Sequence, residues 1–161
     1  MSETTTNATW FTKEAFDRLT AELEGLRGER SAEIAQKISE ARDEGDLKEN
    51  GGYHAAKEEQ GKMEARARQL EALLREGFVE AVADDGVVKP GMVVVAEVNG
   101  REMTFLYAHR ENEAGDLDVY SDTSPLGAAI LGHRAGDTVE FAAPNGKQMP
   151  VKIVSATPYG S

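Results

Sequence analysis

The stretch EGDLKENGGY, residues 44–53, decides how this chain folds. It is rich in glycine and acidic residues, and it separates two long segments in which apolar residues recur every three or four positions. That spacing places apolar side chains along one face of a helix. A short connection between two helices makes them antiparallel neighbours. The stretch therefore predicts the turn of a helical hairpin.

Both flanking segments have a helical period. Thr12 is a suitable N-cap for the first segment, and Arg30 occupies a position at which the apolar pattern expects a nonpolar residue. The apolar face of the first segment contains Phe16, Leu19, Leu23, Leu26, Ile34, Ile38 and Ala41. The seam of the second contains Tyr53, Ala56, Gln60, Met63, Ala67, Leu70 and Leu74. We therefore expect two helices of roughly 27–30 residues, each roughly 40–45 Å long, in an antiparallel coiled coil.

The second half of the chain has the signals of a β-sheet. Short runs rich in Val, Phe and Tyr replace the helical period after Asp84, and Asn99-Gly100 and Asn145-Gly146 are typical of hairpin turns. Ser124-Pro125 predicts the start of a short helix, with Ile130 and Leu131 facing the sheet. The fold class is thus α+β with two domains: the hairpin, then a small antiparallel sheet domain with one helix.

Composition excludes several classes of protein. The 161 residues carry a formal net charge of −11, which argues against broad binding to a phosphate backbone. There is no cysteine, and no apolar run reaches the length of a membrane span. The three histidines are far apart, without metal-ligand spacing. We expect a cytoplasmic monomer with no membrane partner.

The acidic turn allows two interpretations. Asp46 and Glu49 have the spacing of a capping box, in which Asp46 would cap the second helix. Two carboxylates three residues apart can also supply two oxygen ligands to one Mg²⁺, if a second macromolecule completes the coordination. The two roles are compatible. Leu47, Asn50 and Tyr53 are candidate supports of the turn; Tyr53 either packs in the seam or contacts a partner.

The residues around the turn resemble those of a known family. The stretch ARDEGDLKEN, residues 41–50, followed by YHAAKEEQG, residues 53–61, is similar to the signature of the bacterial Gre transcript cleavage factors, GreA type. Ser124-Pro125-Leu126 and the segment 136–139 extend the resemblance into the second half. Gly51-Gly52 departs from many relatives, which have bulkier or charged residues there.

The resemblance implies a fold and a function. Gre factors dock a C-terminal domain of FKBP-like fold on RNA polymerase and insert the coiled coil into its secondary channel. Asp46 and Glu49 would then share the second catalytic Mg²⁺ with the polymerase, which hydrolyses its own backtracked RNA. The factor donates ligands and is not itself an enzyme; the free protein is not expected to bind Mg²⁺ tightly. Ser121, Asp122, Ser124 and Pro125 are the candidate polymerase-docking residues.

The implied domains are a flexible tail at residues 1–10, the hairpin at 11–80, a linker at 81–87 and the docking domain at 88–161.

Two other functions remain open. A Gre-like factor can bind the channel and inhibit or modulate polymerase without cleavage. A prolyl isomerase, suggested by the FKBP-like resemblance, would need a deep aromatic pocket, and the second half lacks tryptophan.

Overall fold

The computed structural model describes residues 8–45 and 50–160. The chain divides into two compact units. One consists of Phe16–Glu76, and the other combines the chain up to Ala15 with everything from Gly77 onward. We describe each unit by itself.

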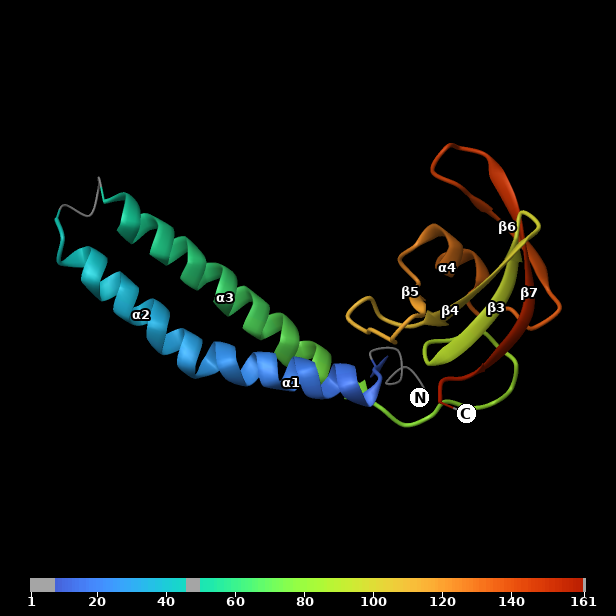
Figure 1. Ribbon diagram of the computed structural model, residues 1–161, viewed down its shortest axis with the longest axis horizontal. Helices are drawn as coiled ribbons and strands as arrows, with labels where there is room; N and C mark the ends of the chain where they lie inside the picture. Colours follow the sequence, from blue (N-terminus) through green and yellow to red (C-terminus); the bar gives the residue numbers. More distant parts are fainter. Residues whose placement is uncertain (1–7, 46–49, 161) are drawn as a thin grey trace, which may run out of the picture. The chain divides into compact units, whose positions relative to one another are not determined.

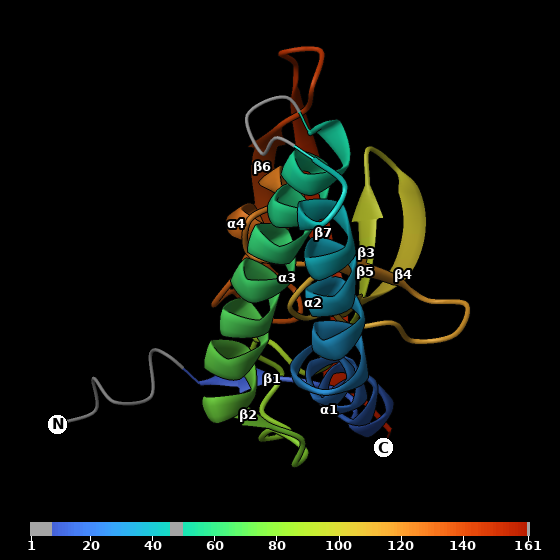
Figure 2. The same ribbon diagram turned by 90° about the vertical axis from the view of Figure 1, so that its left-hand side faces the viewer.

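Three helices form the first unit: α1 (Lys13–Arg27, whose first turn belongs to the other unit), α2 (Glu29–Arg42) and α3 (Gly51–Arg75). Helices α2 and α3 run side by side in opposite directions (Figures 1 and 2). The expected apolar faces are turned inward: Leu19, Leu26, Ile34, Ile38, Ala56, Met63, Ala67 and Leu70 are all buried. The prediction of a helical hairpin is confirmed.

The first helical segment is divided at Gly28, where the sequence predicted one continuous helix. Gly28 has φ −111° and ψ −102°, which lies outside the helical region. A Cβ atom at this position would lie 3.1 Å from the carbonyl oxygen of Glu24. The helix therefore stops at Arg27 and restarts at Glu29, and Arg30 is exposed rather than in the seam.

The second unit contains a five-stranded sheet in the order β5-β4-β3-β7-β6. Its strands are β3 (Met92–Val98), β4 (Arg101–Tyr107), β5 (Asp118–Tyr120), β6 (Thr138–Ala142) and β7 (Gln148–Pro158). All neighbours are antiparallel except β4 and β5, which are parallel. The expectation of a wholly antiparallel sheet is wrong at this edge: residues 108–117 carry the chain back so that β5 runs in the same direction as β4.

The Asn99-Gly100 turn and the Ser124 helix cap have the predicted conformations. Asn99 and Gly100 both have positive φ, 53° and 83°, and they join β3 to β4 in a two-residue hairpin. Ser124 Oγ accepts a hydrogen bond from the Gly127 amide at 3.0 Å, which caps the short helix α4 (Pro125–Ile130). Leu131 is a correction: it is 43% exposed, whereas Leu126 and Ile130 pack against the sheet.

Two apolar clusters make up the core of the sheet domain. The larger joins α4 to β3, β4 and β7 through residues such as Met92, Phe105 and Ile153. The smaller is built around Trp10, Leu106 and Ala108. Val82, assigned to the linker from sequence, packs against both.

Thr9 and Trp10, near the start of the described chain, belong to the unit that contains the sheet. Thr9–Trp10 (β1) pair in parallel with Gly77–Phe78 (β2), and the Trp10 indole donates to the Glu80 carbonyl at 3.0 Å. Trp10 is only 3% exposed. The flexible tail predicted for residues 1–10 therefore does not extend to Thr9 and Trp10, because the indole is buried and its N–H is paired.

Candidate functional site at the turn of the helical hairpin

The two acidic residues of interest fall between α2 and α3. Helix α2 ends at Arg42 and α3 begins at Gly51. Asp46, Leu47 and Glu49 lie outside the described residues. Their predicted roles as metal ligands and as a support of the turn consequently remain predictions, and the geometry described below is that of the flanking residues.

Asn50 caps the second helix, not Asp46. The Asn50 backbone is extended, with φ −88° and ψ 97°, and its Oδ1 accepts a hydrogen bond from the Tyr53 amide at 2.9 Å. This is the N-cap geometry, because the acceptor satisfies an amide that has no partner within the helix. The capping box predicted for Asp46 and Glu49 is therefore wrong for α3: the helix starts four residues later than Asp46 would require.

The same side chain reaches across the hairpin. Asn50 Nδ2 donates a hydrogen bond to the carbonyl oxygen of Ala41, in the last turn of α2. Asn50 is half-buried. One amide group thus pairs with a backbone carbonyl of α2 and with a backbone amide of α3.

Tyr53 lies next to this link. The side chain is half-buried, and the Arg42 guanidinium lies 6.0 Å from the centre of its ring, at the outer limit of a cation–π contact. The His54 ring meets Tyr53 edge-on, with the ring centres 5.5 Å apart. Tyr53 therefore packs partly within the turn while one side of it remains accessible to a partner.

Charged side chains around the turn are mostly exposed. Glu40, Asp43 and Glu44 are exposed, and Gln36 donates to Glu40 at 3.1 Å. The Lys37–Glu59 ion pair is 3.7 Å long between exposed groups, so it contributes little. Within residues 8–45 and 50–160, no group of three or more His, Asp or Glu side chains is placed to hold a metal.

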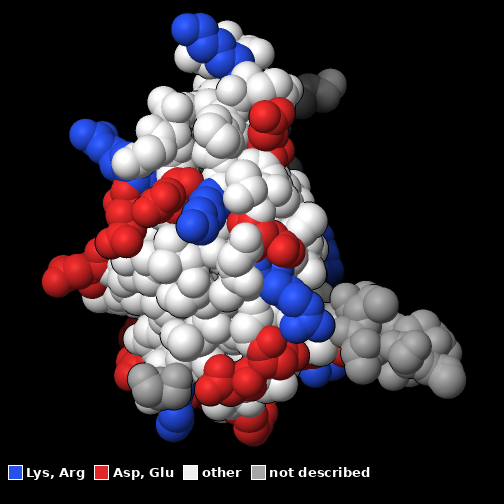
Figure 3. All heavy atoms as spheres, turned by 90° about the vertical axis from the view of Figure 1, so that its right-hand side faces the viewer, with Lys and Arg blue, Asp and Glu red and all other residues white. Residues whose placement is uncertain are grey.

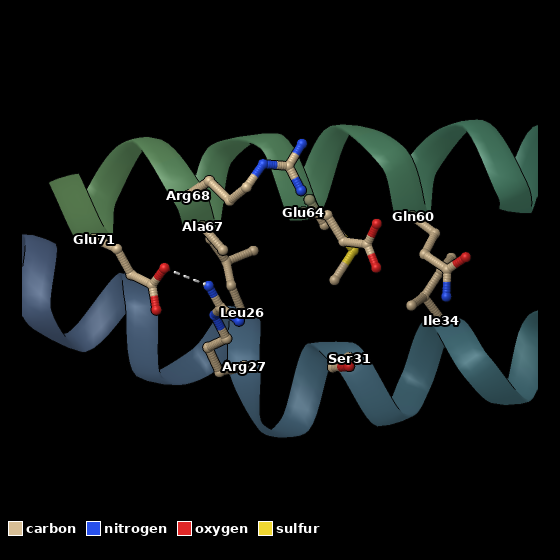
Figure 4. A pocket seen from close by; sticks show the side chains of 10 residues that line it. Leu26, Arg27, Ser31, Ile34, Gln60, Glu64, Ala67, Arg68 and Glu71 are labelled. Atoms are coloured by element: carbon tan, nitrogen blue, oxygen red, sulfur yellow. Dashed lines mark ion pairs between the residues drawn. The ribbon is translucent and has the colours of Figure 1, made fainter.

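A pocket of about 530 Å³ opens between the helices near the break at Gly28. Leu26, Ile34, Met63 and Ala67 supply its apolar lining (Figure 4). Gln60, Ser31 and Glu64 also line it, and the Arg27–Glu71 ion pair of 2.8 Å spans one end. The pocket exists because small or polar residues stand where a seam would need large apolar ones.

The candidate docking residues form a compact turn before α4. Ser124 Oγ donates to the Ser121 carbonyl at 2.7 Å, while Asp122 and Pro125 are exposed. The Tyr107 hydroxyl donates to the Gly127 carbonyl at 2.8 Å, and burial raises the pKa of Tyr107. Of the four residues predicted to dock polymerase, Asp122 and Pro125 thus offer the most accessible side chains.

Sequence reasoning missed Asn112, which links the N-terminal segment to the sheet domain. Asn112 is buried; its Oδ1 accepts from the Thr12 amide at 2.8 Å, and its Nδ2 donates to the Trp10 carbonyl at 3.3 Å. Phe11 packs on the His109 ring. Burial lowers the pKa of His109, whose Nδ1 accepts from the Glu111 amide at 3.1 Å. Nothing in the local sequence marks Asn112, since its partners Thr12 and Trp10 are distant in the chain.

The face drawn in Figure 3 is not a basic platform. On the face drawn in Figure 3, Lys and Arg side chains alternate with Asp and Glu. That mixture agrees with the acidic composition, and on this face it gives no track for a nucleic-acid backbone. Among the described helices, none is both long and apolar enough to cross a membrane.

Comparison with known proteins identifies both halves of the chain. Residues 9–78 match the family model for the N-terminal region of transcription elongation factors GreA and GreB, and residues 83–158 match the model for the C-terminal region. Transcription elongation factor GreA of Streptomyces coelicolor is 53% identical over 163 residues, covering 99% of each chain. The GreA protein of Mycobacterium tuberculosis is 49% identical over 164 residues, covering 98% of this chain and 99% of its own.

Solved structures resemble the chain more loosely. Gfh1 of Thermus aquaticus has 29% identity and a TM-score of 0.42, covering 94% of this chain and 99% of its own. A GreA/GreB factor from Nitrosomonas europaea has 21% identity and a TM-score of 0.39, covering 92% and 98%. Neither score reaches 0.5, so the assignment depends on the sequence matches. Because these matches cover both halves of the chain at about half identity, the chain belongs to the GreA/GreB family of transcription elongation factors.

Proposed function

We propose that this protein is a transcription elongation factor that stimulates RNA polymerase to cleave its own backtracked transcript. The observation that carries the proposal is the position of Asp46 and Glu49 between α2 and α3, within a chain that matches the family over both halves. A hairpin that is narrow along its length can enter a channel and deliver the residues of its turn. The polymerase would supply the catalytic centre.

The two carboxylates are the groups we assign to the chemistry. Mg²⁺ prefers six oxygen ligands and is commonly held by one or two carboxylates with water and phosphate oxygens. Asp46 and Glu49 would hold it from one side, and groups of the polymerase and the RNA from the other. A bound Mg²⁺ activates a water molecule and stabilises charge on the phosphate during phosphodiester hydrolysis. Alone, the pair is a weak site.

The sheet domain is proposed to provide the docking surface. Ser121, Asp122 and Ser124 lie in the turn before α4 and Pro125 begins that helix; the two hydrogen bonds of the Ser124 hydroxyl support the turn. Loops on a rigid scaffold commonly carry binding residues. This assignment depends on the family resemblance as well as on the exposure of Asp122 and Pro125.

The test uses polymerase stalled in a backtracked complex with 3′-labelled RNA and Mg²⁺. The wild-type protein should release short 3′ fragments, whereas Asp46→Asn and Glu49→Gln should not, although both should still compete with wild type for polymerase. Asp43→Asn is the matched control, because it removes one negative charge from an exposed residue at the end of α2. It should cleave like wild type.

Two other results would change the conclusion. Equal cleavage by wild type and both variants would show that neither carboxylate is a required ligand. Binding without cleavage by the wild-type protein would favour a factor that occupies the channel and modulates polymerase.

A further inference from the structure

We propose that Asn50 is a positioning residue: by linking the end of α2 to the start of α3, it closes the segment 41–50 that contains Asp46 and Glu49. This inference builds on the proposed cleavage function. It assigns the positioning of this segment to one side chain that is neither a proposed metal ligand nor a proposed docking residue. The inference depends on the Asn50 side-chain N–H group, which donates a hydrogen bond across the hairpin to Ala41.

The two hydrogen bonds of Asn50 have different consequences. Oδ1 accepts from the Tyr53 amide, which caps α3 and involves only neighbouring residues. Nδ2 donates to the Ala41 carbonyl, nine positions earlier in the chain. Aspartate can replace the first bond, since it is as good an N-cap as asparagine. Its ionised carboxylate has no hydrogen-bond donor, so only the second bond requires the amide.

The bond across the hairpin acts on a carbonyl in the last turn of α2. The last carbonyls of a helix have no partner within it. Ala41 O accepts from the Glu44 amide at 3.1 Å and also from Asn50 Nδ2. The carbonyl is therefore shared between the end of its own helix and the start of the next.

Other contacts across the turn are weaker. The Arg42–Tyr53 contact involves an exposed guanidinium at 6.0 Å, and exposed cation–π pairs contribute little. Gly51 and Gly52 begin α3 and restrict the backbone less than other residues do. Because nearby glycines leave the backbone free, the Asn50 side chain supplies a restraint that the main chain does not.

Closing the segment should matter for rate more than for binding. Fixing the ends of a loop removes conformations in which its side chains point away from their target. A displacement of about 1 Å in a reacting group can reduce rate by roughly 100-fold. Docking to polymerase uses other surfaces, so the concentration of factor needed for half-maximal effect should not change.

The experiment measures single-turnover cleavage in the backtracked complex as a function of factor concentration, for wild type, Asn50→Asp and Asn50→Ala. We expect Asn50→Asp to lower the maximal rate by about tenfold or more while the half-saturating concentration stays within about twofold. Asn50→Ala should be equally slow. Gln36→Ala is the control, because it removes an exposed hydrogen bond within α2 near the turn and should cleave like wild type.

Two results would overturn the proposal. If Asn50→Asp cleaves like wild type and only Asn50→Ala is slow, helix capping alone explains the residue. If both variants raise the half-saturating concentration without lowering the maximal rate, Asn50 acts in binding.

A measurement without polymerase separates this proposal from the proposed function. In the free protein, NMR should show the Asn50 side-chain amide protons exchanging with water more slowly than those of exposed Gln36. Slow exchange with no cleavage by wild type would reject the proposed function and keep the link. Exchange as fast as that of Gln36 would reject the link, whatever the cleavage result.

Discussion

The carbonyl oxygen of Ser121 lies 1.9 Å from the point that a Cβ atom on Gly127 would occupy. Because no side chain fits there, the backbone of the candidate docking turn can pack directly against α4. The Ser124 hydroxyl donates to the same carbonyl at 2.7 Å and accepts from the Gly127 amide at 3.0 Å. Glycine at this position is thus a requirement of the turn's geometry.

Replacing Gly127 by alanine should destabilise the sheet domain. The added methyl group would collide with the backbone of Ser121, and overpacking of this kind costs roughly 1–3 kcal/mol. Guanidinium unfolding followed by the fluorescence of Trp10, the one tryptophan in the sequence, measures the change. A variant as stable as wild type would show that the turn adjusts without cost.

The same substitution at Gly61 should stabilise the hairpin. Gly61 is exposed in the interior of α3, and nothing lies within 4 Å of an added Cβ. Alanine in a helix interior is favoured over glycine by roughly 0.8–1 kcal/mol. Thermal unfolding followed by the helical circular dichroism signal should therefore shift upward. A downward shift would indicate that Gly61 has a backbone role that its surroundings do not reveal.

Filling the pocket between the helices should also stabilise the hairpin. Gln60 lines that pocket and is half-buried, so Gln60→Leu should add about 1 kcal/mol through apolar contact with residues such as Ile34. Gln69→Leu, an exposed change on the same helix outside the pocket, is the control and should alter stability by less than about 0.5 kcal/mol. Equal effects of the two changes would mean that the pocket does not accept the new side chain.

Removing the Asn112 amide should loosen the N-terminal segment. Asn112→Leu would leave the buried Thr12 amide without its partner and the Trp10 carbonyl without its donor, which should cost roughly 2–3 kcal/mol. A red shift of Trp10 emission would report its exposure. Asn145→Ala is the control, because Asn145 only accepts a hydrogen bond in an exposed turn. Unchanged emission and stability in Asn112→Leu would contradict the bridging role.

Acid should weaken the second unit through His109. Burial lowers the pKa of His109 below its ordinary value of 6.5, so the unfolded chain binds the proton first as pH falls. Stability is therefore complete above pH 6.5 and declines below it, down to the lowered pKa. The unfolding free energy of wild type should fall between pH 7 and pH 5.

His109→Asn should reduce that pH dependence. Asparagine does not titrate, and its side-chain oxygen can accept the amide two residues later in the manner of an Asx turn. The carboxylates with lowered pKa, Asp85 and Asp137, titrate below 3.8 and do not contribute in this window. If the variant and wild type lose the same stability between pH 7 and pH 5, another group is responsible.

Local signals predicted much of the fold. The spacing of residues such as Leu19, Ile38 and Leu70 indicated the buried face of the hairpin, because helical geometry converts sequence spacing into direction. Asn99-Gly100 predicted its turn because the required positive φ angles favour those residues. The break at Gly28 was not predicted, since glycine inside a helix is often tolerated.

The candidate site was predicted in part. Asp46 and Glu49 were singled out by charge and by resemblance, while the capping residue was misplaced. Both Asp46 and Asn50 are good N-caps, and local pattern does not distinguish them. The Asn50 amide pairs with Ala41 across the hairpin, and that second partner exists only after the two helices have packed.

By itself the sequence determined the helical hairpin, the strands, their turns and the family, because each depends on neighbouring residues or on a contiguous motif. Tertiary structure alone decided the partners of Asn112, the parallel edge strand β5 and the pairing of β1 with β2. Those features join segments that are separated in the chain. Their energies depend on packing and on the pairing of buried polar groups, which are set only when the separated segments meet.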